Sequence, residues 1–286
     1  MFEKIASVKQ AIKEFTKNLL NDLKERVFVV KILNLMGVAL YLDVETVGDV
    51  EGASYPFDVS FYIIILGVKI TILKKQCFVI SDIFDNPMLM TDVFSGADKI
   101  KELDDKTDYF YEGKDSHLYC KVSINKFVEI MNKLIDKYDI KYLIAYNATF
   151  DYKAVNNLYF LSNATENKFK DLNIIDTKIL FCGLLKYSEK WRKKYIKWCK
   201  KHNKITPKGY ASTKAEHVYQ FLFSLLSFIE KHLGLDDVDI ELRIYKKIMS
   251  IISKELKDMS YNINDLTTLN NCAELYTNKN ALLKVE

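Results

Sequence analysis

Hydrophobic positions divide this chain into a strand-rich first part and a helix-rich second part. Residues 27–42 are apolar and rich in β-branched side chains, which predicts a buried strand that ends at residues 43–45. Two further strands are predicted at 57–73 and 76–83, with Lys74-Lys75 as the turn between them. This part of the chain therefore predicts an antiparallel meander of three strands.

The spacing of apolar residues changes after residue 118. Brief apolar runs at 140–146 and 172–175 predict strands buried on both faces, as parallel strands are. Apolar residues that recur every three or four positions predict helices at 125–137, 150–161, 177–185, 217–229 and 235–256. Residues 85–118 are polar, and we expect them to form covering loops with short helices. A meander followed by alternating helices and strands predicts an α/β fold, with a mixed sheet flanked by helices.

The two ends of the chain differ from its middle. An amphipathic helix is predicted at 2–24, and its apolar stripe can either pack on its own domain or bind a partner. Beyond residue 257 the composition shifts to Asn, Thr and Lys with weak periodicity. We therefore expect an N-terminal helical extension at 1–36, one main domain at 37–256 and a C-terminal tail at 257–286.

Composition excludes some classes of protein. The 42 Lys and Arg against 38 Asp and Glu leave a net charge of only +4, which indicates no partner by itself. Five cysteines without C-x-x-C spacing favour reduced core thiols in a cytoplasmic compartment over disulfides or a zinc site. Charged residues interrupt the N-terminal segment, and Asp58 and Lys69 interrupt the most apolar window, so neither a signal peptide nor a membrane span is predicted.

Two carboxylates close the first predicted strand. Side chains alternate along a strand, so Asp43 and Glu45 point to the same face. Like charges held that close favour the neutral acid unless a cation lies between them, and hard oxygen ligands suit Mg²⁺ or Mn²⁺. The same D-x-E pattern recurs at 49–51 and 239–241, but only the first copy closes a strand.

Two later segments add candidate chemistry. Asn147 is predicted to cap a helix whose first turns carry Asp151, and Gly234 breaks the chain between His232 and Asp237. Taken alone, Asp151 has the ordinary explanation of an acid at a helix N-terminus, and His232 that of a surface residue. Near several carboxylates, however, the imidazole of His232 is suited to act as a general base.

In combination these motifs resemble the DEDDh 3′–5′ exonucleases, a family with the ribonuclease-H-like fold. The resemblance covers about residues 39–248 and rests on Asp-x-Glu at 43–45, Asn-Ala-x-Phe-Asp at 147–151 and His-x4-Asp at 232–237. The chain is most similar to the phage-encoded members, in stretches at 54–58, 195–199 and 214–222, which implies a host cytoplasm. Asp176 also matches a frequent family position, although a helix cap explains it as well.

The resemblance implies roles for eight residues. It implies two divalent cations, Mg²⁺ or Mn²⁺, on Asp43, Glu45, Asp151 and Asp237, with His232 as the general base. Thr46, Asn147 and Phe150 would shape the pocket for the terminal nucleotide. The implied substrate is the 3′ end of single-stranded nucleic acid, with DNA preferred over RNA.

Two other functions are compatible with the sequence. The chain could be a proofreading or accessory subunit whose N-terminal helix docks a polymerase or forms a homodimer, or it could be an RNA-trimming exoribonuclease. The segment at 186–204 carries nine Lys or Arg and one acid, interleaved with aromatic residues. We predict a helix whose aromatic stripe faces the core and whose basic face suits phosphates, while a merely solvated helix remains the alternative.

Overall fold

The computed structural model describes residues 37–50, 53–67, 69–93, 118–229, 234–255 and 283–284. The helix predicted at 2–24 lies outside the described residues, as does His232. Of the predicted tail beyond residue 257, only 283–284 is described. Lys284 forms a bridge with Tyr210, and Leu283 is buried in the core around it.

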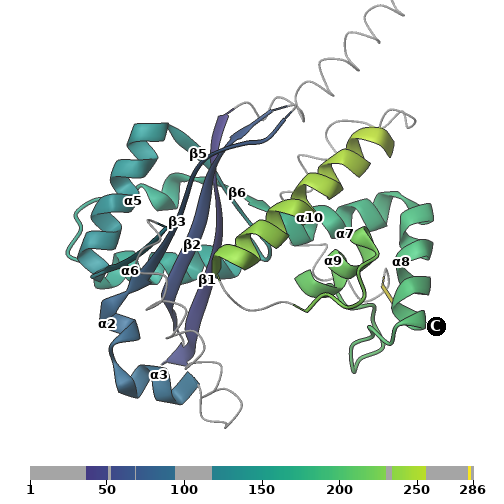
Figure 1. Cartoon of the computed structure of the whole chain (residues 1–286), viewed down its shortest axis with the longest axis horizontal. Coiled ribbons are helices and arrows are strands. Elements are labelled where there is room, and N and C mark those ends of the chain that lie inside the picture. Colours follow the sequence, from purple (N-terminus) through teal and green to yellow (C-terminus); the bar gives the residue numbers. More distant parts are fainter. Residues whose placement is uncertain are drawn as a thin grey trace, which may run out of the picture.

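Six strands form a mixed sheet in the order β4-β3-β2-β1-β5-β6 (Figure 1). The predicted meander is confirmed, because β1 pairs antiparallel with β2, and β2 with β3. The predicted parallel strands are also confirmed, because β5 pairs parallel with β1 and β6 with β5. The α/β fold expected from the sequence, with a mixed sheet flanked by helices, is thus present. The bounds are β1 Gly37–Val50, β2 Ala53–Leu66, β3 Thr71–Ile80, β4 Tyr119–Val122, β5 Ile140–Ala145 and β6 Asn173–Asp176.

Two details of the strands correct the sequence analysis. Lys74 and Lys75 are not a turn but lie inside β3, opposite Ile63 and Tyr62 of β2. The first half of β3 alternates between exposed and half-buried residues, so charged side chains are accommodated there. The second detail is β4, which was not predicted and pairs parallel with β3, because its four residues carry too weak a pattern.

The first strand continues past the two acids, contrary to the prediction that it ends there. β1 pairs with β2 as far as Val50, with register shifts directly after Glu45 and again after Thr46. Such an irregularity breaks the strict alternation of side chains. As a result Val44 and Val47, three residues apart, are both buried in the same core cluster.

Helices cover both faces of the sheet. α5 and α6 pack on one face and α10 crosses the other, while α7, α8 and α9 gather beyond α10, away from α5 and α6 (Figure 1). The helices predicted at 125–137, 150–161, 177–185 and 235–256 are confirmed to within two residues at each end. The predicted helix at 217–229 is wrong at its end, because the chain turns left-handed at Ser224, with φ 57°. The bounds are α2 Ser81–Phe84, α3 Pro87–Val93, α5 Ile124–Tyr138, α6 Ala148–Leu161, α7 Thr177–Tyr187, α8 Glu189–Lys201, α9 Ala215–Phe223 and α10 Gly234–Glu255, with a 3₁₀ turn at Phe169–Asp171.

Alternation along β1 divides the core into two layers. Leu40 and Leu42 point toward α5 and α6, whereas Ala39 and Tyr41 point toward α10. A further apolar cluster joins α7, α8, α9 and α10. Burial of apolar side chains on both faces is the main contribution to stability, at about 25 cal/mol per Å² of apolar surface.

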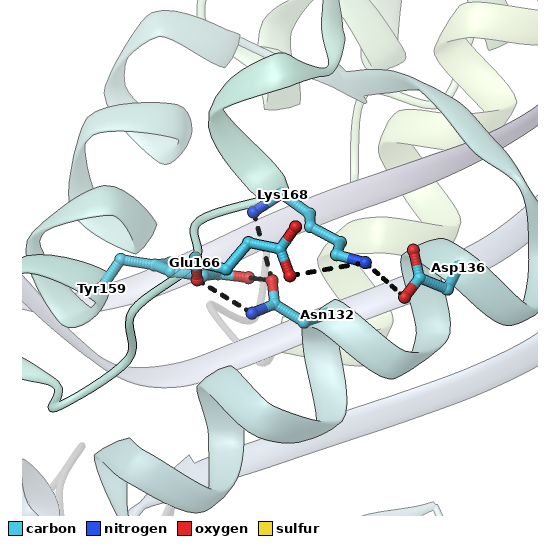
Figure 2. A network of polar contacts seen from close by, with 5 residues as sticks. All are labelled: Asn132, Asp136, Tyr159, Glu166 and Lys168. Atoms are coloured by element: carbon cyan, nitrogen blue, oxygen red, sulfur yellow. Dashed lines mark hydrogen bonds and ion pairs between the residues drawn. The ribbon is translucent and has the colours of Figure 1, made fainter.

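A polar network fastens the connection between α6 and β6 to α5 (Figure 2). The Asn132 side chain donates to the Glu166 carbonyl at 3.0 Å, and its own oxygen accepts from the Tyr159 hydroxyl at 3.0 Å and the Lys168 backbone at 3.2 Å. Lys168 also pairs with Asp136. Together with the buried ring of Phe169, which stacks on Tyr152 and Tyr159, this network holds in place the connection that leads to β6.

The cysteines mostly follow the prediction. Cys77, Cys182 and Cys199 are buried thiols, as expected. Cys120 is exposed on the edge strand β4, so the prediction of a core thiol is wrong there. Among the described residues, no helix combines the length and the apolar character that crossing a membrane requires.

Candidate active site

The centre of the candidate site is the middle of β1. Asp43 and Glu45 continue the alternation of Ala39 and Tyr41, which places both carboxylates on the face of the sheet that α10 covers. Tyr41 pairs with Ile144 near the end of β5, so Asp43 lies level with the carboxyl end of that strand. In open α/β sheets, ligands bind at this edge of the parallel strands.

The third acid of the site comes from the first turn of α10. The helix begins at Gly234, where the sequence predicted a break, and Asp237 follows three residues later. Carboxylate oxygens of Asp43, Glu45 and Asp237 all lie within 4.8 Å of one another. The structure therefore brings together three side chains that the sequence places in its first and last motifs.

Gly234 allows α10 to begin against the sheet. A Cβ atom at this position would lie 2.3 Å from Ser60 Oγ, 2.6 Å from Asp58 Oδ1 and 2.8 Å from Ser60 Cβ. Only glycine fits so close an approach. Because Asp237 lies three residues further along, this contact sets where its carboxylate enters the site.

The fourth acid, Asp151, lies near Asp43. Asp151 is buried in the first turn of α6, directly after the carboxyl end of β5. Among the neighbouring carboxylates, Asp151 raises the pKa of Asp43 most. Its oxygens do not belong to the set from Asp43, Glu45 and Asp237 that lie within 4.8 Å of one another. Asp151 thus borders the cluster of the other three acids.

The turn that carries Asp151 has an unusual backbone. Asn147 occupies the N-cap position of α6 with a left-handed φ of 73°. The prediction that its side chain caps the helix is wrong, because that side chain makes no cap hydrogen bond. Its backbone N–H instead donates to Asp176 Oδ1 at 3.2 Å. The same oxygen accepts from the backbone of Lys178 at 2.8 Å and of Ile179 at 3.2 Å, so Asp176 caps α7, the ordinary explanation given for it above.

Burial and mutual repulsion shape the electrostatics of these acids. Burial raises the pKa of Asp43 well above its ordinary value, and the charges of Asp151, Glu45, Asp237 and Asp58 raise it further. Burial likewise raises the pKa of Asp151, although hydrogen bonds from backbone N–H groups, among them that of Val44, oppose this shift. Without a counter-charge, these carboxylates would hold protons that ordinary aspartates release.

A divalent cation fits this donor set. The three side chains within 4.8 Å offer only carboxylate oxygens, which Mg²⁺ and Mn²⁺ prefer, and no sulfur or imidazole that would favour a softer metal. A cation would also offset the repulsion that raises the pKa of Asp43. The chemistry of the cluster and its charge therefore point to the same kind of ligand.

Two buried acids beside the site were not predicted. Asp58 lies opposite Glu45 in the sheet, and its Oδ1 accepts from Ser60 Oγ at 2.8 Å and Cys77 Sγ at 3.3 Å. Glu241, one turn after Asp237 on α10, accepts from the Tyr146 backbone at 3.3 Å. The sequence feature that could have identified Asp58 is a charged residue within an otherwise apolar strand. Glu241 belongs to the D-x-E sequence at 239–241, which lies on α10 and closes no strand.

The remaining predicted residues are placed as follows. Thr46 and Asn147 are partly exposed, and the Phe150 ring is 41% exposed next to Asp151. His232 lies outside the described residues, between α9 and α10. The structure thus leaves Thr46, Asn147 and Phe150 at least partly accessible to solvent.

Comparison with known proteins yields weak matches only. No protein-family model matches the chain, and a search of curated proteins finds no match. Solved structures that resemble it include E. coli exonuclease I with a dT13 oligonucleotide, the zinc-bound E. coli ExoI–ssDNA complex and an apo exonuclease I. Each is 13% identical with a TM-score of 0.47, and they cover 78%, 78% and 82% of this chain. The chain spans only 43%, 42% and 47% of those chains, respectively, and similarity this weak says nothing about its chemistry.

Proposed function

We propose that this protein is a divalent-metal-dependent 3′–5′ exonuclease that releases mononucleotides from single-stranded nucleic acid. The observation that carries the proposal is the meeting of Asp43, Glu45 and Asp237 within 4.8 Å, with Asp151 beside them. These are the four acids that the resemblance to the DEDDh family assigned to metal binding.

The four acids would hold two cations, Mg²⁺ or Mn²⁺. Bound there, the cations would stabilise the negative charge that develops on the phosphate and on the entering and leaving oxygens. Asp43 interacts with the charges of both Asp151 on α6 and Asp237 on α10, so it is the side chain suited to contact both ions. Asp58 and Glu241, which accept hydrogen bonds from neighbouring groups, would hold β2 and α10 in place around the site.

The chain's own residues would supply the proton transfer and the fit to the strand end. The imidazole of His232 would take a proton from the attacking water, whose oxygen then bonds to the phosphorus. The bond from phosphorus to the 3′ oxygen of the preceding nucleotide breaks, and that oxygen takes up a proton. Thr46, Asn147 and Phe150, which are at least partly exposed and next to the acids in sequence or one turn away, would contact the terminal nucleotide.

A labelled-strand assay tests the proposal. DNA and RNA strands of about 20 nucleotides, labelled at either end, are incubated with Mg²⁺, Mn²⁺ or a chelator, and the products are resolved over time. We expect a ladder that shortens from the 3′ end and 5′-mononucleotides as products, with no reaction in chelator. Internal cuts, shortening from the 5′ end or undiminished hydrolysis in chelator would each contradict the proposal.

The same assay separates the alternatives left open by the sequence. Hydrolysis of RNA with no hydrolysis of DNA would favour an RNA-trimming enzyme, since such a choice depends on contacts to the 2′-hydroxyl. Binding of a strand without hydrolysis would favour an accessory subunit.

Asp176 provides a prediction about how the site is positioned. Its Oδ1 connects the Asn147 turn to the first amides of α7, so Asp176→Ala should remove both a helix cap and the support of the turn that carries Asp151. We expect a loss of about 0.5–2 kcal/mol in the free energy of unfolding, together with a lower kcat on the labelled strand. Chemical denaturation and initial rates measure the two effects.

Two substitutions at Asp176 distinguish capping from positioning. Asp176→Ser retains an N-cap oxygen for α7, but that oxygen lies one bond closer to the main chain and should not reach the Asn147 N–H. It should restore stability without restoring kcat, whereas Asp176→Asn should restore both. If Asp176→Ser also restores full kcat, Asp176 acts only as a cap.

A further inference from the structure

Helix α8 presents a continuous basic surface. Its exposed cations are called here the α8 basic face, namely Lys190, Lys193, Lys194, Lys197, Lys200 and Lys201. The acid of this helix, Glu189, pairs with Lys193 at 2.8 Å. Six lysines and Arg192 against this one acid give α8 a net positive field that attracts anions.

The aromatic residues of α8 are used for packing, as predicted. Tyr195 is fully buried, with its ring centroid 4.7 Å from that of Phe221 and 4.9 Å from that of Phe181. Trp191 and Trp198 also pack against Phe221. The ring of Tyr195 is therefore not free to stack on nucleobases, and Trp191 and Trp198 are half-buried, so the exposed part of α8 attracts a partner mainly through charge.

The position of α8 relates its charge to the candidate site. α7 follows its N-cap residue Asp176, which is hydrogen bonded to the Asn147 turn that precedes Asp151. Its 11 residues lead to Ser188 and then to α8, and at 1.5 Å per residue they span roughly 16 Å. α7, α8 and α9 share a core with α10, on the side of the sheet to which Asp43 and Glu45 point (Figure 1).

We propose that the α8 basic face binds the phosphates of the single strand on the 5′ side of the terminal nucleotide. The proposal rests on the exonuclease function above and specifies how its substrate is held. Contacts to phosphates alone carry no base sequence, so the attachment is indifferent to sequence, sensitive to salt and effective only on strands long enough to reach α8. A nucleic acid strand fits better than a membrane, because α8 has already buried its apolar face.

A matched pair of variants tests this inference. The first changes Lys190, Lys194, Lys197 and Lys201 to Gln. The control changes four exposed lysines near α5, on the other side of the sheet, and alters the net charge equally. These are Lys126, Lys133, Lys137 and Lys170.

Binding is measured by the fluorescence anisotropy of a labelled 20-nucleotide strand, in an Asp43→Asn background that prevents degradation. We expect the α8 variant to raise Kd by roughly 10- to 100-fold at 50 mM salt and to reduce the slope of log Kd against log salt by about 3. The control should change Kd less than about threefold. In the active enzyme, the α8 variant should raise KM for the 20-mer, leave kcat unchanged and leave kcat/KM for a trinucleotide unchanged.

The outcomes separate this inference from the proposed function. If both variants weaken strand binding equally, the effect is one of net charge and the inference is wrong. If neither variant weakens strand binding, α8 is not part of the binding surface. Binding to vesicles with anionic phospholipid, without binding to the strand, would assign the face to a membrane and also overturn the inference. An inactive protein whose strand binding depends on the α8 lysines would support the surface and contradict the exonuclease.

Discussion

Asp43→Asn should abolish metal-dependent hydrolysis while leaving the protein folded and, without divalent cations, more stable at neutral pH. The amide removes one charge from a cluster in which three carboxylates meet within 4.8 Å. Loss of several kcal/mol of transition-state stabilisation corresponds to a rate lower by about 10²- to 10³-fold or more.

The expected gain in stability follows from the sign of the pKa shift. Burial and neighbouring charges raise the folded-state pKa of Asp43 above its unfolded value, so the charged form favours unfolding. This penalty is absent below the unfolded pKa and appears as pH rises above it. Because Asn cannot ionise, the thermal unfolding midpoint of the Asp43→Asn variant in chelator at pH 7 should exceed that of the parent protein. Added Mg²⁺ should raise the midpoint of the parent protein more than that of the variant.

Asp239→Asn is the matched control for this experiment. Asp239 also belongs to a D-x-E sequence, but it lies on α10 and pairs with Arg243 at 2.7 Å. Its loss should leave hydrolysis unchanged and alter stability by no more than about 1 kcal/mol. An Asp43→Asn protein that is folded and fully active would end the assignment of the acids to metal binding.

Gly234→Ala should reduce both stability and activity, although alanine is normally the better helix former. In an unobstructed helix position the change would stabilise by up to about 1 kcal/mol. Here the added Cβ would lie 2.8 Å from Ser60 Cβ and closer still to Ser60 Oγ and Asp58 Oδ1. Overpacking of this kind costs about 1–3 kcal/mol, and displacement of the α10 start would move Asp237 away from Asp43.

Denaturation and rate measurements on two further variants isolate the contact at Gly234. Gly67→Ala is the control, since a Cβ there meets no atom closer than the Lys69 carbonyl at 4.0 Å. Combining Gly234→Ala with Ser60→Ala removes the nearest atom and should recover part of the stability. Unimpaired stability and activity in Gly234→Ala alone would show that α10 begins further from the sheet than described.

The periodicity of the sequence was sufficient for the framework of the fold. The continuous apolar run that ends at Leu42 identified β1, and because side chains alternate along a strand, the common direction of Asp43 and Glu45 could be predicted. Periodic apolar stripes likewise located α5, α6 and α10. These predictions succeeded because each depends on neighbours within one element.

Features that depend on contacts between elements could not be read from local pattern. Lys74 and Lys75 suggested a turn, because only the pairing with β2 shows that β3 accommodates charge there. The burial of Asp58 depends on Ser60, Cys77 and the approach of Gly234, which come from three separate segments. Similarly, Asn147 was predicted as a side-chain cap, whereas Asp176 holds its backbone in a left-handed turn.

The register shift in β1 makes the spacing of residues near the acids as important as their identity. Val44 and Val47 both reach the core, so the two residues between them, Glu45 and Thr46, can both stay out of it. A strand without this irregularity would direct Thr46 toward the same side as Val44, away from the carboxylates. Insertion or deletion of a single residue in this short segment would therefore turn apolar side chains such as Val47 out of the core and turn polar side chains into it.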